Sequence, residues 1–478
     1  MKRREPVIAI FDIGKTNKKL LLFNQRYEVV GEESTSFPET TDEDGFPCED
    51  IERLTDWIKL HVAALKRSEV FRLKAINFST YGASIVLTGK HGERIMPLLN
   101  YLKPYPDGLL EQFTSSYGGA EKIAIETSSP MMGHLNAGLQ LYWLKQRKPA
   151  LFDELSSVLH FPQYLSFLFT EKRFAEMTNL GCHSAMWNFS EGAYHDWLGK
   201  EGILGKLNDV IKGDTAVIKG EGEGEDAVAV GVGLHDSSAA VIPYLQSFTD
   251  PFVIVSTGTW TVSLNPFNKD MPTAEELAGG CLSYLTYEGD PVKASMNFAG
   301  NDHDTQVNRI AEFFAVQPAY FRTLEYDAKW IHYTDGSAID QSESLGSPTT
   351  PCVFHTRDLS SFDSAEHAYH QLIVDIIDRQ RIATGMVLTG KTVRNMYVDG
   401  GFCQNRIYMQ LLADAFPAMQ VYATSMVQGT ALGAALAIHK HWNSEPIPGS
   451  LIRLKHWEAS GMTGVTGRRG KPGQSLVI

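Results

Sequence analysis

The chain has 478 residues, 43% of them hydrophobic and 21% charged, and this composition excludes wholesale disorder and leaves room for two domains with substantial cores. A formal net charge of −13 argues against nucleic acid or an anionic membrane as the main partner. The five cysteines are scattered and form no CxxC pair, so reduced thiols are expected rather than disulfides or a zinc site.

No apolar run long enough for a signal peptide or a membrane span occurs, so a cytoplasmic location is expected.

The first third of the sequence predicts alternating strands and helices. Residues 6–24 predict two buried strands around a polar turn, and residues 49–67 predict an amphipathic helix. Residues 73–99 return to strand patterns around the turn STYGAS, and residues 134–170 predict helices.

The same pattern starts again in the second half. Residues 252–264 predict another strand, Gly-Thr turn and strand. A helix near 365–385, the strand end MYVDGG, a helix at 404–415, the strand MQVYA and the helix GTALGAALAIHKH follow. The repeat is one of pattern, because the two halves share negligible identity.

The domain organisation follows from these two pattern units. We expect an N-terminal domain at 1–245, a C-terminal domain at 246–458 and a mobile tail at 459–478 that is poor in core residues. The glycine-acid run at 220–226 predicts a loop within the first domain.

One segment matches the P-loop pattern GxxxxGK[ST], namely residues 385–392. A P-loop needs a strand before it and a helix after it, because its amides and the helix N-terminus then face the phosphate. Here a predicted helix precedes the match and a predicted strand follows it. An ordinary helix-to-strand connection that ends in a glycine turn is therefore the favoured interpretation.

Two turns between strands suggest phosphate binding. Asp12 to Asn17 (DIGKTN) places a carboxylate at a strand end, where it can hold a hydrated Mg²⁺, and adds amides and a hydroxyl that can bind phosphate. Ser256 to Trp260 (STGTW) repeats this chemistry in the second half. Either turn alone also makes a good hairpin, but the pair could hold a triphosphate from two sides.

Three further segments carry polar or small residues at places where a strand meets a helix. Asp399 to Asn405 (DGGFCQN) lets a flat ring lie on two glycines, with Asn405 able to bond an adenine edge, or it is a plain turn. Gly429 to Ala435 predicts close helix packing. Asp236, in HDSSAA, is either a helix N-cap or a general base.

Taken in order, these segments resemble the FGGY carbohydrate kinases, the family of glycerol, xylulose, ribulose, rhamnulose and fuculose kinases. VIAIFDIGKTNKKLLLF is similar to the first phosphate loop of the family, and IVSTGTWTVSL to the second. VDGGFCQNRIYMQLLADAF followed by GTALGAALA resembles its adenosine segment, and GLHDSSAA the segment with the catalytic aspartate. The resemblance covers roughly residues 6–440.

The resemblance implies an α/β fold of two ribonuclease H-like domains, as in actin and hexokinase, with a cleft between them. It implies ATP and Mg²⁺ as cofactors and a small sugar as substrate. A homodimer is the candidate assembly, although the sequence does not determine the oligomeric state. The first domain would hold the sugar site, the first phosphate loop and the catalytic aspartate, and the second domain the second loop and the adenosine segment. Asp236 would be the catalytic base and Asp12 would place Mg²⁺ through water. The implied ATP and phosphate ligands are Gly14, Lys15, Thr16, Gly258, Thr259, Gly400, Gly401 and Asn405, and the implied sugar contacts are Thr80, Tyr81, Gly82, Ala83, His235 and Asp236.

The residues that would contact the sugar match the family less well than the other segments do. STYGAS at 79–84 resembles the TWGVD or TFGVD loop of the rhamnulose and fuculose kinases, but Ala83 and Ser84 stand where a carboxylate is expected. Lys15 and the lysines 18 and 19 replace small residues of the first loop, and they either favour phosphate or belong to the surface. The polar run at 301–304 either touches sugar or caps a helix.

The expected activity is ATP-dependent phosphorylation of a ketose, with a 6-deoxyketose such as L-rhamnulose or L-fuculose favoured and a xylulose, ribulose or polyol kinase as the alternative. An actin-like nucleotide-gated binding protein without phosphoryl transfer is an alternative of another class. The aspartate in the GLHDSSAA position and the sugar-type loop argue against it, and sugar-dependent ADP release separates the two. A P-loop NTPase is opposed by the inverted context of residues 385–392.

Overall fold

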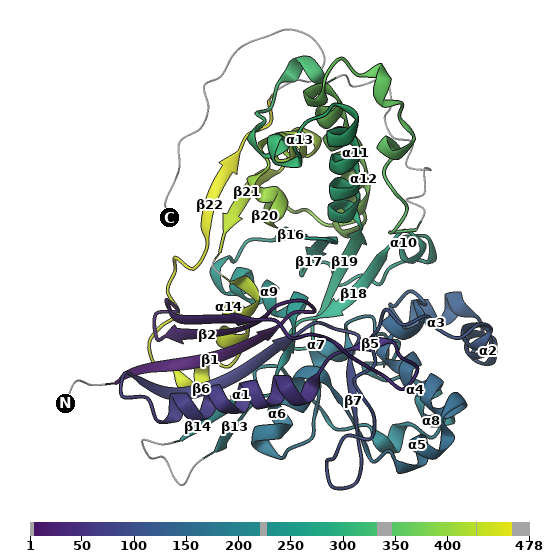
Figure 1. The fold of residues 1–478 in the computed structure, drawn as a ribbon, viewed down its shortest axis with the longest axis vertical. Helices are drawn as coiled ribbons and strands as arrows, with labels where there is room; N and C mark the ends of the chain where they lie inside the picture. The colour runs from purple at the N-terminus through teal and green to yellow at the C-terminus, as the bar shows by residue number, and fades with distance from the viewer. Residues whose placement is uncertain (1–3, 220–226, 332–346, 427, 461–478) are drawn as a thin grey trace. The chain divides into compact units, whose positions relative to one another are not determined.

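The computed structural model describes residues 4–219, 227–331, 347–426 and 428–460 (Figure 1). The chain divides into two compact units, each of mixed α/β structure. Unit 1 consists of Met1–Ser247, Ser283–Pro291 and Val427–Leu451, and unit 2 of Phe248–Leu282, Val292–Met426 and Ile452–Ile478. Within the described ranges, no helix combines the length and the apolar character needed to cross a membrane.

Unit 1 is built on one large sheet with helices on both faces. Its strands are β1 (Glu5–Ile13), β2 (Lys18–Asn24), β3 (Val29–Thr35), β4 (Thr40–Thr41), β5 (Pro47–Cys48), β6 (Phe71–Thr80), β7 (Ile85–Thr88), β8 (Ser157–His160), β9 (Ala175–Glu176), β10 (Trp187–Asn188), β11 (Ala193–Tyr194), β12 (Val210–Ile211), β13 (Ala216–Lys219), β14 (Val228–Gly231) and β15 (Leu234–His235). Its helices are α1 (Ile51–Lys66), α2 (Leu109–Ser116), α3 (Ala120–Thr127), α4 (Ala137–Arg147), α5 (Pro149–Glu154), α6 (Phe161–Thr170), α7 (Met177–Leu180), α8 (Asp196–Lys200), α9 (Asp236–Ser247), α14 (Gly429–Ala437) and α15 (His439–Trp442).

Unit 2 carries the second large sheet and three long helices. Its strands, with β18 and β19 at the chain crossings, are β16 (Phe252–Thr257), β17 (Thr261–Asn265), β18 (Cys281–Leu285), β19 (Pro291–Asn297), β20 (Asn395–Gly400), β21 (Gln420–Ser425) and β22 (Arg453–Trp457). Its helices are α10 (Ala274–Ala278), α11 (Ala299–Phe313), α12 (Ala365–Leu388) and α13 (Arg406–Ala415).

The two sheets share one strand order. In unit 1 the order is β13-β14-β6-β1-β2-β3, and in unit 2 it is β18-β19-β17-β16-β20-β21-β22. In each sheet an antiparallel meander comes first (β1 to β3; β16, β17 and β19), a parallel strand then pairs with its first strand (β6; β20), and another parallel strand follows (β14; β21). The repeat of pattern inferred from the sequence is therefore a repeat of topology.

Opposite faces of the unit 1 sheet pack against different helices. Phe11 and Phe78 join Leu54 of α1 in one hydrophobic core. On the other face Asn77 donates a hydrogen bond from Nδ2 to the carbonyl oxygen of Ala434 in α14, at 2.8 Å. Because alternate strand residues point to opposite faces, the apolar run of each strand fills two cores.

Most predicted elements are present, with one clear correction. The helical prediction for residues 134–170 is wrong at Ser157–His160, which form strand β8 and pair antiparallel with β7. The four residues SVLH are completely buried, and a short apolar run cannot be assigned to a helix or a strand from periodicity alone. The run at 220–226 and most of the tail at 459–478 lie outside the described residues.

The two compact units differ from the two continuous ranges predicted at 1–245 and 246–458, although the first crossing, between Ser247 and Phe248, lies close to residue 245. The difference arises because α14 packs on α9, β1 and β6 of unit 1. A Cβ added at Gly433 of α14 would collide with the carbonyl oxygen of Ala239 in α9. Glycine is needed at this position, which bears out the expected close helix packing.

Candidate functional site

Two acidic residues lie at the carboxyl ends of parallel strands in unit 1. Asp12 on β1 pairs in register with Ser79 on β6, which also pairs with Leu234 on β15, and Asp236 follows β15 directly. Neighbouring parallel strands end at one edge of a sheet, which is where ligand sites of such sheets gather. The two carboxylates, which are far apart in the sequence, therefore meet at one edge.

The charge of Asp236 affects the protonation of Asp12. Burial, followed by the negative charge of Asp236, raises the pKa of Asp12 to about 7, although Lys19 opposes the shift. Among the described residues no group of three or more His, Cys, Asp or Glu side chains could hold a metal. Mg²⁺ commonly uses one or two protein carboxylates and completes its shell with water and phosphate, so this donor set fits a hydrated Mg²⁺.

Asp236 has a defined ionic partner in His235. The Nε2 atom of His235 lies 3.1 Å from Oδ1 of Asp236 and 3.1 Å from Sγ of Cys182. Burial favours protonation of Asp236, but the charge and hydrogen bond of His235 outweigh it and lower the carboxyl pKa overall. The carboxylate is therefore ionised at neutral pH and can accept a proton, with 35% of its side chain exposed.

Cys182 is a residue that the sequence did not single out. Burial would raise the pKa of its thiol, but His183 and His235 lower it overall. A Cβ at Gly82, in the predicted sugar loop, would lie 2.8 Å from Cys182 Sγ. The thiol and the imidazole of His235 thus leave room for glycine alone at this point of the loop. No local signal indicates the contact, because 53 residues separate Cys182 from His235.

The first turn is held from inside by Lys18. Its Nζ atom donates to the carbonyl oxygens of Gly14 at 3.2 Å and Lys15 at 3.0 Å, and pairs with Glu49 at 3.0 Å. The side chain is 2% exposed, so Lys18 is neither a surface residue nor free for a phosphate. Tyr81 donates its hydroxyl to Glu49 at 3.3 Å, which links the first turn to the loop at residues 79–84.

Lys15 and Thr16 remain at the solvent-facing part of the turn. Lys15 pairs with Glu39 at 2.7 Å, with 25% and 43% of the two side chains exposed. Exposed pairs of this type contribute about 0.2–1 kcal/mol, so the pairing leaves Lys15 able to change partner. In the loop at residues 79–84, Thr80 donates its hydroxyl to the carbonyl oxygen of Tyr81, and Ala83 has a positive φ of 56°.

In unit 2 the second turn and the glycine pair lie on adjacent strands. Thr257 on β16 pairs with Gly400 on β20, and Gly258 N donates to Trp260 O at 2.9 Å, which closes the turn. Gly400 has φ +83°, and a Cβ there would collide with the Thr257 carbonyl oxygen. Gly258 and Thr259 are thus brought next to Gly400 and Gly401, as a shared nucleotide site requires.

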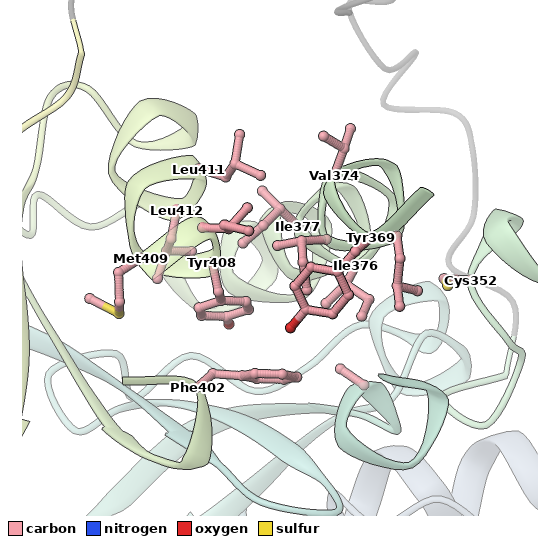
Figure 2. Packing of buried hydrophobic residues seen from close by; sticks show 14 of the residues in the cluster. Cys352, Tyr369, Val374, Ile376, Ile377, Phe402, Tyr408, Met409, Leu411 and Leu412 are labelled. Atoms are coloured by element: carbon pink, nitrogen blue, oxygen red, sulfur yellow. The ribbon is translucent and has the colours of Figure 1, made fainter. Parts of the chain in front are cut away.

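Asn405 holds the turn after the glycines. Its Oδ1 accepts from the backbone amides of Ile407 and Tyr408 at 3.1 Å, so it N-caps α13, and its Nδ2 donates to the Tyr369 hydroxyl at 2.9 Å. One N–H of the amide remains for a ligand. Figure 2 shows Phe402 beneath Tyr408 and Tyr369, and the rings of Phe402 and Tyr408 stack at 4.5 Å between centroids.

The polar run at 301–304 supports this second site within the first turns of α11. Asn301 N donates to the Thr259 carbonyl oxygen at 3.1 Å, and Asp302 accepts from Cys352 N. His303 Nε2 lies 3.0 Å from the Tyr369 hydroxyl, and Nδ1 lies 3.1 Å from Asp304. These contacts give the four residues a structural role, but it is not that of a helix cap, because α11 begins after Phe298 and no side chain caps it.

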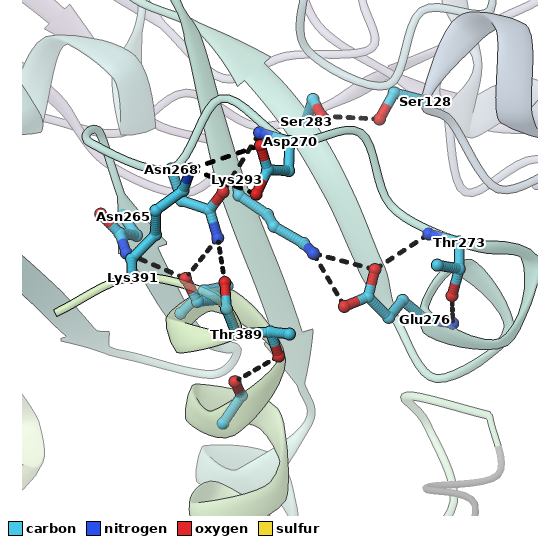
Figure 3. Close-up of polar contacts among 12 residues, drawn as sticks. Ser128, Asn265, Asn268, Asp270, Thr273, Glu276, Ser283, Lys293, Thr389 and Lys391 are labelled. Atoms are coloured by element: carbon cyan, nitrogen blue, oxygen red, sulfur yellow. Dashed lines mark hydrogen bonds and ion pairs between the residues drawn. The ribbon is translucent and has the colours of Figure 1, made fainter.

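The segment at 385–392 has the geometry of a helix end. Its first residues complete α12, and Asn268 donates from Nδ2 to the Val387 carbonyl oxygen at 2.9 Å (Figure 3). Lys391 pairs with Asp270 at 3.2 Å. Carbonyl oxygens at a helix C-terminus repel phosphate, whereas a P-loop offers amides at an N-terminus. The rejection of a P-loop agrees with this geometry.

Comparisons with known proteins identify the family of the chain. Residues 7–211 match the N-terminal domain model of the FGGY family of carbohydrate kinases, and residues 359–439 match its C-terminal domain model. The chain belongs to the FGGY family of carbohydrate kinases. The prediction of the family is confirmed, and so is the α/β fold of two actin- and hexokinase-like domains.

Individual FGGY relatives are distant. A rhamnulokinase from Oceanobacillus iheyensis is 23% identical over 267 residues, and the match spans 52% of this chain and 54% of that protein. The chain thus matches about half the length of this curated relative. A carbohydrate kinase from Novosphingobium aromaticivorans has a TM-score of 0.74 at 21% identity, over 96% of this chain and 95% of the other.

Two further FGGY structures have a similar fold. A xylulose kinase from Rhodospirillum rubrum has a TM-score of 0.75 at 16% identity, and a gluconate kinase from Lactobacillus acidophilus has 0.73 at 16%. Each match covers 95% of this chain and 94% of the other. At this identity the likeness concerns the fold, and these relatives are named for different substrates.

Proposed function

We propose that the protein phosphorylates a small sugar with Mg-ATP, and that the sugar is a ketose. The supporting observation is the strand-end arrangement of unit 1, in which Asp12 and Asp236 share one sheet edge and His235 keeps Asp236 ionised. Membership of the FGGY family supports the reaction class. We assign Asp236 as the general base and Asp12 as the group that places Mg²⁺ through water.

The transfer moves the γ-phosphoryl group from ATP to a sugar hydroxyl oxygen. The oxygen–phosphorus bond to the sugar forms, the bond to the β-phosphate bridging oxygen breaks, the hydroxyl proton passes to Asp236, and ADP leaves. Mg²⁺ supplies charge neutralisation on the transferring phosphoryl group. Asp236 orients the hydroxyl, and His235 limits the movement of Asp236 through its 3.1 Å contact.

The nucleotide residues of the proposal come from both turns. Gly14, Lys15 and Thr16 bind phosphate in unit 1, and Gly258 and Thr259 bind it in unit 2. Gly400 and Gly401 border the adenine, with the remaining N–H of Asn405 directed to its edge. The close approach of Gly400 to the Thr257 carbonyl oxygen, which excludes any side chain, supports a flat surface at this point.

For the substrate we favour a 6-deoxyketose, with Thr80, Tyr81, Gly82, Ala83 and His235 as sugar contacts. STYGAS resembles the loop of the rhamnulose and fuculose kinases, and one curated relative, 23% identical over 267 residues, is a rhamnulokinase. A xylulose, ribulose or polyol substrate is the alternative. A panel of ketoses and polyols, assayed for ADP release with and without Mg²⁺, identifies the substrate, and ATP turnover of equal rate without sugar would contradict the proposal.

Replacing Asp236 with Asn tests the assignment of the base. Asn keeps the shape of the side chain but cannot take the proton, and general-base catalysis contributes about 10²–10⁴-fold. We expect kcat with the best ketose to fall at least about 100-fold, while ATP binding and the melting temperature stay nearly unchanged. Steady-state kinetics and a melting curve measure these quantities.

The matched control is Asp363→Asn, the same substitution at a carboxylate that is 79% exposed and lies 3.5 Å from Nδ1 of His367, outside the proposed site. Its kcat should equal that of the wild type. An Asp236→Asn variant with near-normal kcat would return Asp236 to the role of a residue that starts α9.

A further inference from the structure

His134 is a buried side chain whose two ring nitrogens have no hydrogen-bond partner in the part of the chain that the structure describes. It lies in the 3-10 helix Gly133–Leu135, directly before α4, and is 2% exposed. Buried polar atoms are almost always hydrogen-bonded, and exceptions often mark a functional site. No motif of the sequence includes this residue.

The ring of His134 is held in one orientation by aromatic neighbours. Its centroid lies 4.7 Å from that of Tyr105 and 5.5 Å from that of Trp143. Burial, and secondarily the charge of Lys103, lower the pKa of His134 to about 4. At neutral pH the imidazole is therefore uncharged, with one nitrogen that donates a hydrogen bond and one that accepts.

Gln140 connects His134 to the sugar loop. Its Nε2 donates to the carbonyl oxygens of His134 and Ala83, each at 2.7 Å, so both backbones meet at one nitrogen. Its Oε1 is buried and has no partner among the described residues. Ala83 is the loop residue with positive φ, so Gln140 also fixes the strained part of that loop.

The unmatched atoms have the chemistry of a hydroxyl receptor. A hydroxyl group has one donor and two acceptor positions, so a sugar needs at least two hydroxyl groups to satisfy the donor and the acceptor of a neutral imidazole and the acceptor of an amide. An acid sugar would need a cation. Lys103, whose charge helps to lower the pKa of His134, already pairs with Asp42 and Asp44 at 2.5 Å each, so it is not free to bind the carboxylate of a sugar acid.

We propose that His134 and Gln140 form a hydroxyl-binding subsite beside residues 79–84, and that this subsite selects an uncharged polyhydroxy sugar over a sugar acid. The inference rests on the proposed sugar-kinase function and names the substrate class of the same site. His134 discriminates between sugars because a site with buried polar groups rejects substrate analogues that leave those groups without hydrogen bonds.

The test compares His134→Phe with the control Tyr105→Phe in the full chain. Phe keeps an aromatic ring between Tyr105 and Trp143 and removes both unpaired nitrogens. The melting temperature of the ligand-free protein should therefore stay the same or rise. The KM for the best ketose should rise about 10-fold or more, as the loss of a buried hydrogen bond predicts, while kcat and the KM for ATP stay close to wild type. Tyr105→Phe removes a hydroxyl that already has a partner, the Leu139 carbonyl oxygen, and should leave the ketose KM unchanged.

A second measurement needs no phosphoryl transfer. L-rhamnulose, L-fuculose, D-xylulose and D-gluconate are each added without ATP, and the melting temperature is recorded. A ketose should raise it for the wild type, gluconate should not, and His134→Phe should lose the ketose effect.

The outcomes separate the inference from the proposed function. A wild type that prefers gluconate, or a His134→Phe variant with unchanged ketose KM, overturns the subsite and leaves the kinase in place. A lower melting temperature with unchanged KM assigns His134 to a structural water and also overturns it. If no sugar yields ADP, the proposed function fails. The melting experiment then still decides the subsite, because absence of any sugar effect refutes it and loss of an effect in His134→Phe supports it.

Discussion

Lys18 places an ammonium group beneath the first turn of unit 1, with Gly14, Lys15 and Glu49 as partners. From the composition of the run GKTNKK alone, one expects each lysine to lie on the surface or to bind phosphate. Lys18 is buried instead, because it is the first residue of β2 and the alternation of that strand points its side chain inward. There the carboxylate of Glu49 compensates its charge. A single sequence does not show this compensation, since the two residues are far apart in the chain.

Removing one partner of this buried ion pair should cost much of the stability of unit 1. Lys18→Met leaves the Glu49 carboxylate buried without a counterion, and such changes typically cost about 3–5 kcal/mol. We expect the free energy of unfolding, measured by urea titration, to fall by that amount. The double variant Lys18→Met/Glu49→Gln should recover a large part of the loss, because Gln carries no charge and still accepts from Tyr81. Additive losses in the double variant would contradict this interpretation of the pair.

His160 makes the stability of the protein sensitive to acid. Burial, and then the charge of His235, lower its pKa from 6.5 to about 4. Because the unfolded chain binds this proton more readily, the stabilisation is complete above about pH 6.5 and is lost as the pH falls toward 4. Between pH 7 and pH 5 the wild type should lose about 2 kcal/mol more than His160→Gln, which does not titrate.

Urea titrations of both proteins at pH 7 and pH 5 measure this difference. Equal losses in the two proteins would show that His160 does not carry the acid sensitivity.

At the scale of elements, the close contact of α14 with α9 depends on one glycine. Gly433→Ala places a methyl group against the Ala239 carbonyl oxygen, so the helices must separate, and overpacking of this kind typically costs about 1–3 kcal/mol. Gly385→Ala is the same substitution in the long helix α12, where a Cβ meets no atom within 4 Å. Alanine is favoured over glycine in helices by about 1 kcal/mol, so this variant should be more stable than wild type.

Thermal melting of the two variants beside the wild type should therefore give shifts of opposite sign. Shifts of the same sign would mean that helix propensity, and not the contact with α9, governs α14. Gly385→Ala also changes the first residue of the P-loop-like segment, and on our interpretation it leaves ATP binding intact.

The elements themselves could be predicted where they are long and periodic. α1, α12 and the strands β1, β2, β16 and β17 lie where the sequence places them, because apolar spacing over many residues distinguishes 3.6-residue from two-residue periodicity. The strand β8 could not be predicted, because four buried residues show no period. Contacts between side chains distant in sequence, such as Cys182 with His235, follow from packing and have no local signal.

The molecule as a whole repeats one sheet topology in two units that share negligible sequence identity. Hydrophobic runs around a Gly-Thr turn were enough to indicate the repeat. They were not enough to indicate which unit each later segment joins. The helix α14 follows β21 of unit 2 in sequence but packs in unit 1, because its small residues fit against α9, β1 and β6.

The return of the chain to unit 1 at Val427–Leu451 has a consequence for its synthesis. Residues up to Ser247 leave the ribosome first, yet their sheet lacks the helix that covers Asn77 until α14 has been made. At about 5–20 residues per second, translation of the intervening segment lasts roughly 10–40 seconds. During that interval the nascent first unit exposes an apolar sheet face, and a chaperone that binds extended apolar surface has its opportunity there.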